Sequence, residues 1–144
     1  MNKESNVAIY VRVENNDEIA LKNQTEYIKE HLEKLNIKVG KIYADIDVSD
    51  KNFNRPALNN LIKDVEDKKI KDIYIYDLSR LSEDRKKVIE FYKNNLGKNK
   101  VNLFLVKDRL EFKQIITISD LVDLWIKEER KKSREFAQKY RNER

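Results

Sequence analysis

Three arginines stand where a phosphate group could be bound. Arg12 lies in an apolar run, Arg55 precedes a proline, and Arg80 follows a second apolar run. Each guanidinium offers a planar fork of donors, so three of them at one edge of a sheet would form a phosphate site. The alternative is that each pairs with a nearby carboxylate, and the spacing alone favours neither interpretation. The candidate partners are Asp45, Asp47, Asp77, Glu83 and Asp84.

Some of these carboxylates offer a second chemistry. Asp45, Asp47 and Asp77 follow predicted strands, and hard cations such as Mg²⁺ prefer carboxylate ligands. A phosphatase-like or receiver-like magnesium site is therefore an alternative, although we favour pairing of these carboxylates with Arg55 or Lys51. The chain has no cysteine and one histidine, which excludes disulfides, thiolate metal sites and histidine-rich metal sites.

The elements that must position these residues alternate between strands and helices. The first strand, around residues 7–13, is apolar or aromatic apart from Arg12, and this pattern predicts a strand buried on both faces at the centre of a mostly parallel sheet. Three further strands are predicted over residues 37–43, 70–76 and 101–106. This order predicts an α/β fold in three layers, with helices on the faces of the sheet and ligands at the carboxyl ends of the strands.

Helical patterns fill the gaps between these strands. Asp17 can cap a helix through about Leu35, and Pro56 suits the first turn of the second helix. Ser82 can cap the third helix. The apolar stripe of the first helix is predicted to contain Leu21, Gln24, Ile28, Leu32 and Leu35.

The end of the chain has a different character. Residues 107–117 look like a connecting segment, whereas residues 118–144 contain neither glycine nor proline. Positions spaced alternately four and three apart predict a long helix with a dimer seam, apolar at its two ends and charged at Glu129 and Lys132 in its middle. The alternative is a helix that packs on its own sheet and frays after Trp125. The residues expected at the dimer interface are Ile118, Leu121, Val122, Trp125 and Phe136.

The second half of this predicted helix is basic. From residue 127 to 144 there are eight Lys and Arg against four Glu. We expect it to contact DNA through residues such as Lys131, Lys132 and Arg134. No sequence follows that could form a zinc module or a helix-turn-helix, so we expect residues 1–117 as an α/β domain, residues 118–144 as its helix, and no separate DNA-binding domain.

Composition and charge limit the possible partners and location of the protein less strictly. The formal net charge is +5, and charged residues make up 40% of the chain, which is compatible with a nucleic-acid partner. No apolar run approaches the roughly 20 residues that a membrane span needs. The amino terminus has no apolar signal core, so we expect a cytoplasmic protein.

Several separated motifs resemble the catalytic domain of serine recombinases, the resolvase/invertase family. They are Tyr10-Val11-Arg12-Val13, then Gln24, then Ser49 with Asn54-Arg55-Pro56-Ala57-Leu58, then Asp77-Leu78-Ser79-Arg80-Leu81-Ser82. The resemblance covers about residues 6–142. It implies the resolvase fold, dimerisation through the last helix, DNA recombination of the kind found on mobile genetic elements, and no metal or other cofactor. In this family a serine attacks the DNA phosphodiester, and an arginine cluster stabilises the phosphoryl transition state.

The departures from the family pattern matter more than the matches. Glu14 occupies the position that the resemblance assigns to the nucleophilic serine. Ser79 stands where the family has an aspartate, Glu83 stands where it has an arginine, and the second loop reads Ser49-Asp50 instead of Ser-Gly. A carboxylate is a poor nucleophile for a phosphodiester and repels it. Ser49, Ser79 or Ser82 could replace the lost hydroxyl only from a displaced position.

These observations lead to one main hypothesis and two alternatives. The main one is a recombinase-like pseudoenzyme that has lost strand cleavage, with Glu14 and Glu83 paired to Arg12 and Arg80. It would act as a homodimer, with an active recombinase, or weakly on DNA. The first alternative is an active recombinase that uses a displaced serine, and the second is the magnesium-dependent domain.

Overall fold

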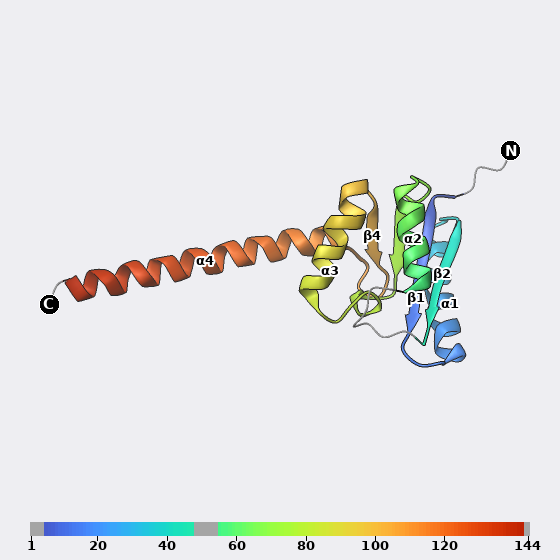
Figure 1. Cartoon of the computed structure of the whole chain (residues 1–144), viewed down its shortest axis with the longest axis horizontal. Coiled ribbons are helices and arrows are strands. Elements are labelled where there is room, and N and C mark those ends of the chain that lie inside the picture. The colour runs from blue at the N-terminus through green and yellow to red at the C-terminus, as the bar shows by residue number, and fades with distance from the viewer. Residues whose placement is uncertain (1–4, 48–54, 143–144) are drawn as a thin grey trace. The chain divides into compact units, whose positions relative to one another are not determined.

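The computed structural model describes residues 5–47 and 55–142. A five-stranded sheet forms the centre of the first part of the chain, in the order β2-β1-β3-β4-β5 (Figure 1). The first four strands are parallel to one another, and β5 is antiparallel to β4. The mostly parallel α/β fold predicted from the sequence is therefore confirmed. The strands are β1 Val7–Val13, β2 Lys41–Ile46, β3 Asp72–Ile75, β4 Asn102–Leu105 and β5 Leu110–Glu111.

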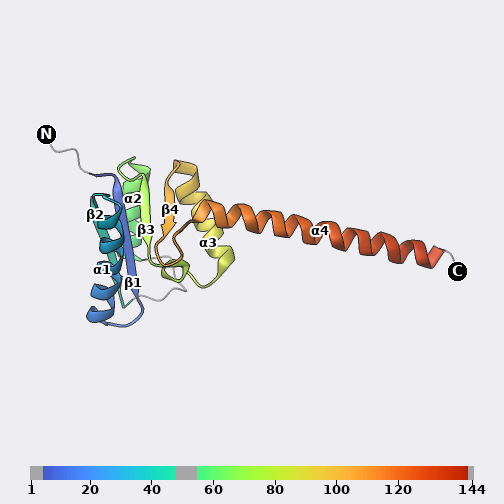
Figure 2. The same cartoon turned by 180° about the vertical axis from the view of Figure 1, so that it is seen from behind.

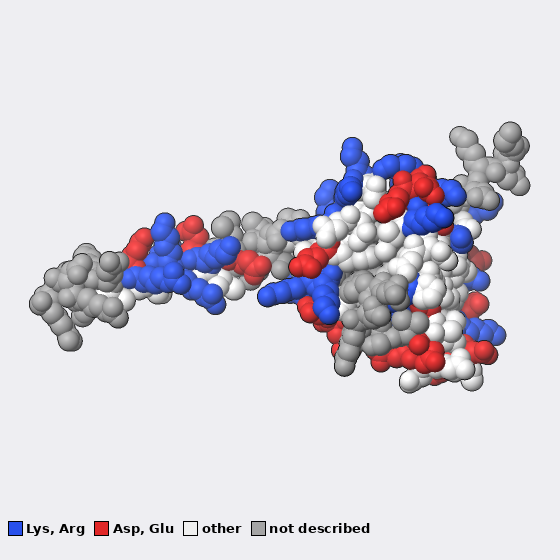
Figure 3. All heavy atoms as spheres, in the orientation of Figure 1, with Lys and Arg blue, Asp and Glu red and all other residues white. Residues whose placement is uncertain are grey.

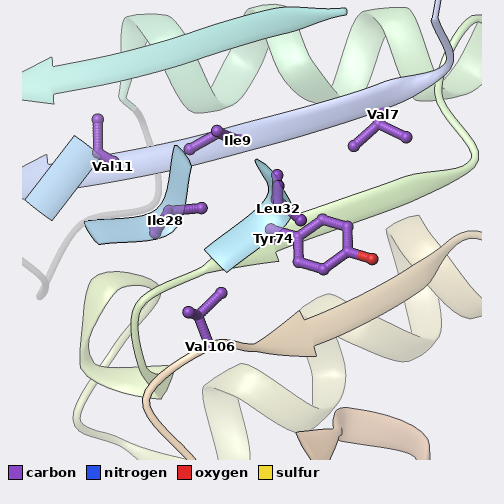
Figure 4. Close-up of a cluster of buried hydrophobic side chains, with 7 residues drawn as sticks. All are labelled: Val7, Ile9, Val11, Ile28, Leu32, Tyr74 and Val106. Atoms are coloured by element: carbon purple, nitrogen blue, oxygen red, sulfur yellow. The ribbon is translucent and has the colours of Figure 1, made fainter. Parts of the chain in front are cut away.

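β1 is an interior strand, second in the sheet order between β2 and β3, and all seven of its residues are buried. Alternate side chains of a strand point to opposite faces of the sheet. Val7, Ile9 and Val11 face helix α1 (Glu18–Lys34) and pack with Ile28 and Leu32 of that helix (Figure 4). Tyr74 and Val106 complete this cluster. The other face receives Ala8, Tyr10 and Arg12, so β1 carries two polar side chains into a buried region that also contains Asp45 and Arg55.

Helices cover both faces of the sheet. α1 lies over one face, and α2 (Pro56–Glu66) and α3 (Arg85–Phe91) lie over the other, as the two opposite views show (Figures 1 and 2). α3 continues through a π-helical turn, η2 (Tyr92–Leu96), and a short 3-10 helix, η3 (Gly97–Asn99). The three-layer architecture thus matches the sequence prediction.

The local signals at the helix starts are partly confirmed. Asp17 caps α1, because its side chain accepts a hydrogen bond from the Ala20 N–H at 3.0 Å, and Pro56 is the first residue of α2. The cap predicted for α3 is wrong. Asp84 accepts from the Lys86 N–H there, whereas Ser82 is buried and accepts from the Asp84 N–H.

Two further predictions need correction. Leu35 is not part of the buried stripe of α1; it is the C-cap residue and is 54% exposed, because the helix has ended by this position. Residues 107–117 are not a simple connection. They contain β5 and the start of the last helix, α4 (Phe112–Asn142), in which Phe112 is buried against the Tyr92 ring.

The chain divides into two compact units, residues 1–112 and residues 113–144. In the second unit, the described side chains of α4 include two large exposed apolar residues, Trp125 at 64% and Phe136 at 66%. No helix in the described part of the chain has the length and hydropathy to cross a membrane.

Candidate functional site

The candidate site lies at the carboxyl ends of β1, β2 and β3, where the family resemblance places catalysis. Arg12 lies near the end of β1, Asp45 near the end of β2, and β3 leads into a 3-10 turn, η1 (Leu78–Arg80). Arg55 lies just before α2, whose first residues approach the same edge. The sheet therefore brings Arg12, Arg55 and Arg80 together, as the sequence predicted.

Arg55 is held in a buried polar network. Its side chain is 0% exposed, and its guanidinium donates to the carbonyl of Arg80 at 2.8 Å, to the carbonyl of Leu81 and to the Tyr10 hydroxyl at 3.4 Å. The Tyr10 hydroxyl in turn donates to Asp45 at 2.8 Å. Burial raises the pKa of Tyr10 above its ordinary value, so its phenol remains protonated and donates to the carboxylate.

Asp45 connects this network to α2. Its two oxygens accept from the backbone N–H groups of Ala57 at 2.8 Å and Leu58 at 3.0 Å. These groups are in the first turn of a helix whose N-cap residue makes no side-chain cap. A carboxylate from β2 thus performs the cap that the local sequence lacks, and it favourably faces the positive end of the helix. Tyr10 therefore links Arg55 to Asp45, one of the carboxylates considered as arginine partners from the sequence.

Arg12 binds the same turn as Arg55. Its side chain is buried and donates to the carbonyls of Ser79 at 2.7 Å and Arg80 at 2.9 Å. Gln24 on α1 holds its backbone, accepting from the Arg12 N–H and donating to the Arg12 carbonyl. The Gln24 side chain makes the backbone hydrogen bonds that a neighbouring strand would otherwise make, because β3 pairs with β1 only over Val7–Ile9.

Backbone carbonyls were the partners that sequence reasoning missed. From the sequence we considered only phosphate or carboxylates as partners of the arginines. In the structure, Arg12 and Arg55 both donate hydrogen bonds to the carbonyl oxygens of residues 79–81. A signal was present, because Leu78-Ser79-Arg80-Leu81 is too short for a regular helix and leaves several carbonyls to be satisfied. Asp77 stabilises the start of this turn by accepting from the N–H and the hydroxyl of Ser79.

Glu14 lies at the mouth of the site. Its carboxylate is 3.6 Å from Nη1 of Arg12 and is 57% exposed. Arg80 lies against the Tyr76 ring, with its guanidinium carbon 5.4 Å from the ring centroid. Its Nη1 donates to the Arg12 carbonyl, while its buried Nε has only an ion-pair distance of 3.6 Å to Asp77 and no hydrogen bond.

A hollow of about 310 Å³ opens beside these residues. Two arginines and three carboxylates contribute to its wall, so its formal charge is negative, which is unfavourable for a phosphate. It is lined by Arg12, Val13, Glu14, Asn15, Asp17, Ala20, Ser79, Arg80 and Glu83. A second hollow of about 420 Å³ adjoins it and is lined in part by Tyr27, Tyr76, Gln24 and Arg80.

The remaining sequence-predicted residues lie elsewhere. Ser49 falls outside the described residues, as do the side chains of Ile118, Leu121 and Val122. Lys131, Lys132 and Arg134 are exposed on α4, and Lys132 is 3.8 Å from Glu129 of the same helix. They belong to the second compact unit together with Trp125 and Phe136.

The magnesium alternative receives no support from this arrangement. Both Asp45 oxygens are used by Tyr10 and the start of α2, and Asp77 is used by Ser79 and Arg80. Among the side chains that the structure describes, no three histidine, cysteine or carboxylate groups lie together so that they could hold a metal ion.

Comparison with known proteins agrees with the fold and the motifs. The N-terminal catalytic domain of TP901-1 integrase has 24% identity and a TM-score of 0.74, covering 85% of this chain and 96% of that one. The C-terminal catalytic domain of ISC1926 TnpA, an IS607-like serine recombinase, has 23% identity and a TM-score of 0.63, covering 82% and 79%. A resolvase family site-specific recombinase from Streptococcus pneumoniae has 20% identity and a TM-score of 0.65, covering 94% and 97%.

At these identities the solved structures support the fold alone. No curated protein matches the sequence significantly. The family model described as resolvase, N terminal domain, matches residues 7–142, which is almost the whole chain. The chain therefore belongs to the resolvase N-terminal domain family of serine recombinases.

Proposed function

We propose that this domain has lost DNA strand cleavage and acts by association. The observation that carries the proposal is the Glu14 carboxylate 3.6 Å from the Arg12 guanidinium, at the position that the motif resemblance assigns to the nucleophile. At ~4 Å and an effective dielectric constant of ~20, its repulsion of a scissile phosphate is about 4 kcal/mol. That corresponds to roughly three powers of ten in rate, before the missing hydroxyl is considered.

The positions of the arginines support the same conclusion. Phosphoryl transfer depends on cations that face the developing charge. The hydrogen bonds of Arg55 hold the 79–81 turn and Tyr10, and the side chain has no exposed surface. Arg12 is also buried and makes equivalent bonds to that turn. Both arginines thus serve the structure of the edge, with Glu14 and Glu83 reducing its positive charge.

Association is assigned to α4. Trp125 and Phe136 expose large apolar side chains, and such exposure on a long helix is typical of an interface. The exposed basic residues Lys131, Lys132 and Arg134 suit contact with DNA on the same helix. The domain would therefore pair with a second copy or with an active recombinase, and residues 1–117 with the helix over 118–144 would act as one functional unit.

A covalent-adduct assay tests the loss of cleavage. The purified protein is incubated with supercoiled plasmid carrying candidate recombination sites, denatured, and examined for DNA-linked protein alongside an active serine recombinase. We expect adducts with the active enzyme and none with this domain. An adduct that disappears when a serine is replaced by alanine would refute the proposal.

One observation favours a displaced nucleophile as the second candidate function. The Ser79 hydroxyl donates to the Asp77 carboxylate and lines the hollow that also contains Arg12 and Arg80. A hydroxyl bonded to a carboxylate is the arrangement of an activated nucleophile. Ser79→Ala compared with Ser82→Ala in the adduct assay distinguishes the two: loss of an adduct with the first variant only would assign cleavage to Ser79.

A further inference from the structure

The opposite edge of the sheet, where the strands begin, is rich in lysine. Seven exposed lysines lie in or beside the segments that lead into β2, β3 and β4: Lys38, Lys41, Lys68, Lys69, Lys71, Lys98 and Lys100. In Figure 3 the blue atoms of basic residues gather along the upper edge of the sheet-containing unit around one acidic patch. Red carboxylate atoms gather below β1, β2 and α1. The two edges thus differ in charge.

A hollow of about 640 Å³ opens at this basic edge. Its wall has four lysines, Lys38, Lys41, Lys68 and Lys69, and a single carboxylate, Asp64. The hydroxyl of Tyr43 donates to Asp64, and Lys41 lies 3.5 Å from it. Tyr43 and Lys41 lower the pKa of Asp64, so the carboxylate is already paired and three lysines remain in excess.

Two of the edge lysines occupy backbone positions that favour glycine. Lys68 has φ 63° and Lys100 has φ 58°, and each follows a helix that closes with the paired hydrogen bonds of a Schellman motif. A left-handed conformation costs a residue with a side chain about 1–2 kcal/mol. Glycine would be less strained at both positions, but Asn36, Asp47 and Arg109 share this conformation, so the case for the edge depends on its charge.

Helix ends account for only part of the cluster. A lysine near a helix C-terminus is stabilised by the negative end of the dipole, which applies to Lys68 after α2. That effect falls off within the last turn, and Lys38, Lys41 and Lys71 lie at strand starts. The stabilisation of helix ends therefore does not explain the whole cluster, which extends across the edge of the sheet.

We propose that this lysine edge binds the phosphate backbone of duplex DNA. Neighbouring strands are about 4.8 Å apart, so the edge from β2 to β4 spans about 14 Å. One DNA strand presents a phosphate about every 3.4 Å along the axis, so about four phosphates face the edge. Lysines act as point charges without base-edge geometry, so the contact is independent of sequence. The contact requires no cleavage, and it is on the edge opposite to the candidate catalytic site.

Fluorescence anisotropy with a labelled 30-base-pair duplex tests this assignment across a salt series starting at about 50 mM. Three triple variants have equal charge change and differ in location. The edge variant is Lys38→Gln/Lys69→Gln/Lys71→Gln. The control on α3 and η2 is Lys86→Gln/Lys87→Gln/Lys93→Gln, and the control on α4 is Lys127→Gln/Lys131→Gln/Lys132→Gln.

We expect the edge variant to bind at least tenfold more weakly at the lowest salt than the α3 variant. Its log–log salt slope should fall by up to about 2.7, at about 0.9 for each phosphate that the variant no longer neutralises. In the wild-type protein, DNA should also protect Lys38, Lys69 and Lys71 from acetylation, as read by mass spectrometry. This readout separates the edge from any contribution of α4.

The proposal is overturned if the edge variant binds as well as the α3 variant, or if DNA leaves the edge lysines unprotected. Binding of anionic lipid vesicles without binding of DNA would also overturn it, because the shared chemistry would then belong to a membrane. Circular dichroism confirms folding of each variant. A covalent adduct in the cleavage assay would affect the proposed function and leave this result unchanged.

Discussion

Replacing Asp45 by asparagine tests whether the buried network holds the sheet edge together. The carboxylate accepts from the Tyr10 hydroxyl and from the first turn of α2, and it is 3% exposed. The asparagine side chain keeps one acceptor oxygen, but its NH₂ group would face hydroxyl or N–H donors that the second carboxylate oxygen now accepts from. It also removes the negative charge near the fully buried Arg55.

The expected cost follows from burial. A buried donor that loses its acceptor costs about 1–3 kcal/mol, so we expect a loss of about 3 kcal/mol here, which includes the lost cap of ~1 kcal/mol. Domains of this size unfold with about 5–15 kcal/mol, so the loss is a large fraction of the total. Urea unfolding followed by circular dichroism measures it, with unchanged m-values as the check that both variants unfold as the wild type does.

Asp64→Asn provides a matched control in the same protein. Asp64 also accepts from a tyrosine hydroxyl, that of Tyr43, and also lies near a cation, Lys41, but it is more exposed. We expect a loss of only about 1 kcal/mol there. If Asp45→Asn costs no more than Asp64→Asn, the reasoning about the network is refuted. If Asp45→Asn does not fold, Tyr10→Phe removes one hydroxyl and should cost about 1–2 kcal/mol.

Three other predictions concern the interface, alkaline pH and backbone strain. Trp125→Asp should lower the mass measured by sedimentation velocity at a concentration where the wild type self-associates, whereas the control Glu128→Gln should not. Equal masses for the wild type and Trp125→Asp would contradict an interface on α4. Burial raises the pKa of Tyr10 and Tyr43, so the folded state keeps these protons longer than the unfolded state, whose tyrosines titrate near 10. The free energy of unfolding should therefore be constant below about pH 10 and fall above it by up to about 1.4 kcal/mol per pH unit for each tyrosine. Urea titrations of Tyr10→Phe should show a smaller slope. A slope equal to that of the wild type would contradict the raised pKa of Tyr10. Lys100→Gly should raise the free energy of unfolding by about 0.5–1 kcal/mol, because glycine tolerates the φ of 58°; a loss would argue against strain there.

Local patterns predicted much of the fold because they depend on neighbouring residues only. The apolar run at residues 7–13 predicted a strand buried on both faces, and β1 is buried along its whole length, although it lies second in the sheet order and not at the centre. Asp17 and Pro56 marked the starts of α1 and α2 because capping and proline geometry are set within one turn. The family motifs likewise predicted that Arg12, Arg55 and Arg80 would meet at one edge.

The start of α4 was beyond such reasoning. A two-residue strand, β5, has no periodicity to detect, and it exists because β4 offers it an antiparallel neighbour. The true cap of α3 was similarly ambiguous, since Ser82 and Asp84 are both good N-cap residues and burial of Ser82 decided between them.

The sequence by itself determined the residue types at the candidate site, including a carboxylate at position 14 and three arginines near strand ends. Tertiary structure alone decided what those arginines bind. Arg12 and Arg55 satisfy the carbonyls of residues 79–81, and Asp45 satisfies the amides of α2 through contacts between distant segments. The physical reason is that a buried backbone group must find a partner wherever the fold provides one, and the sequence does not reveal which long side chain will be within reach.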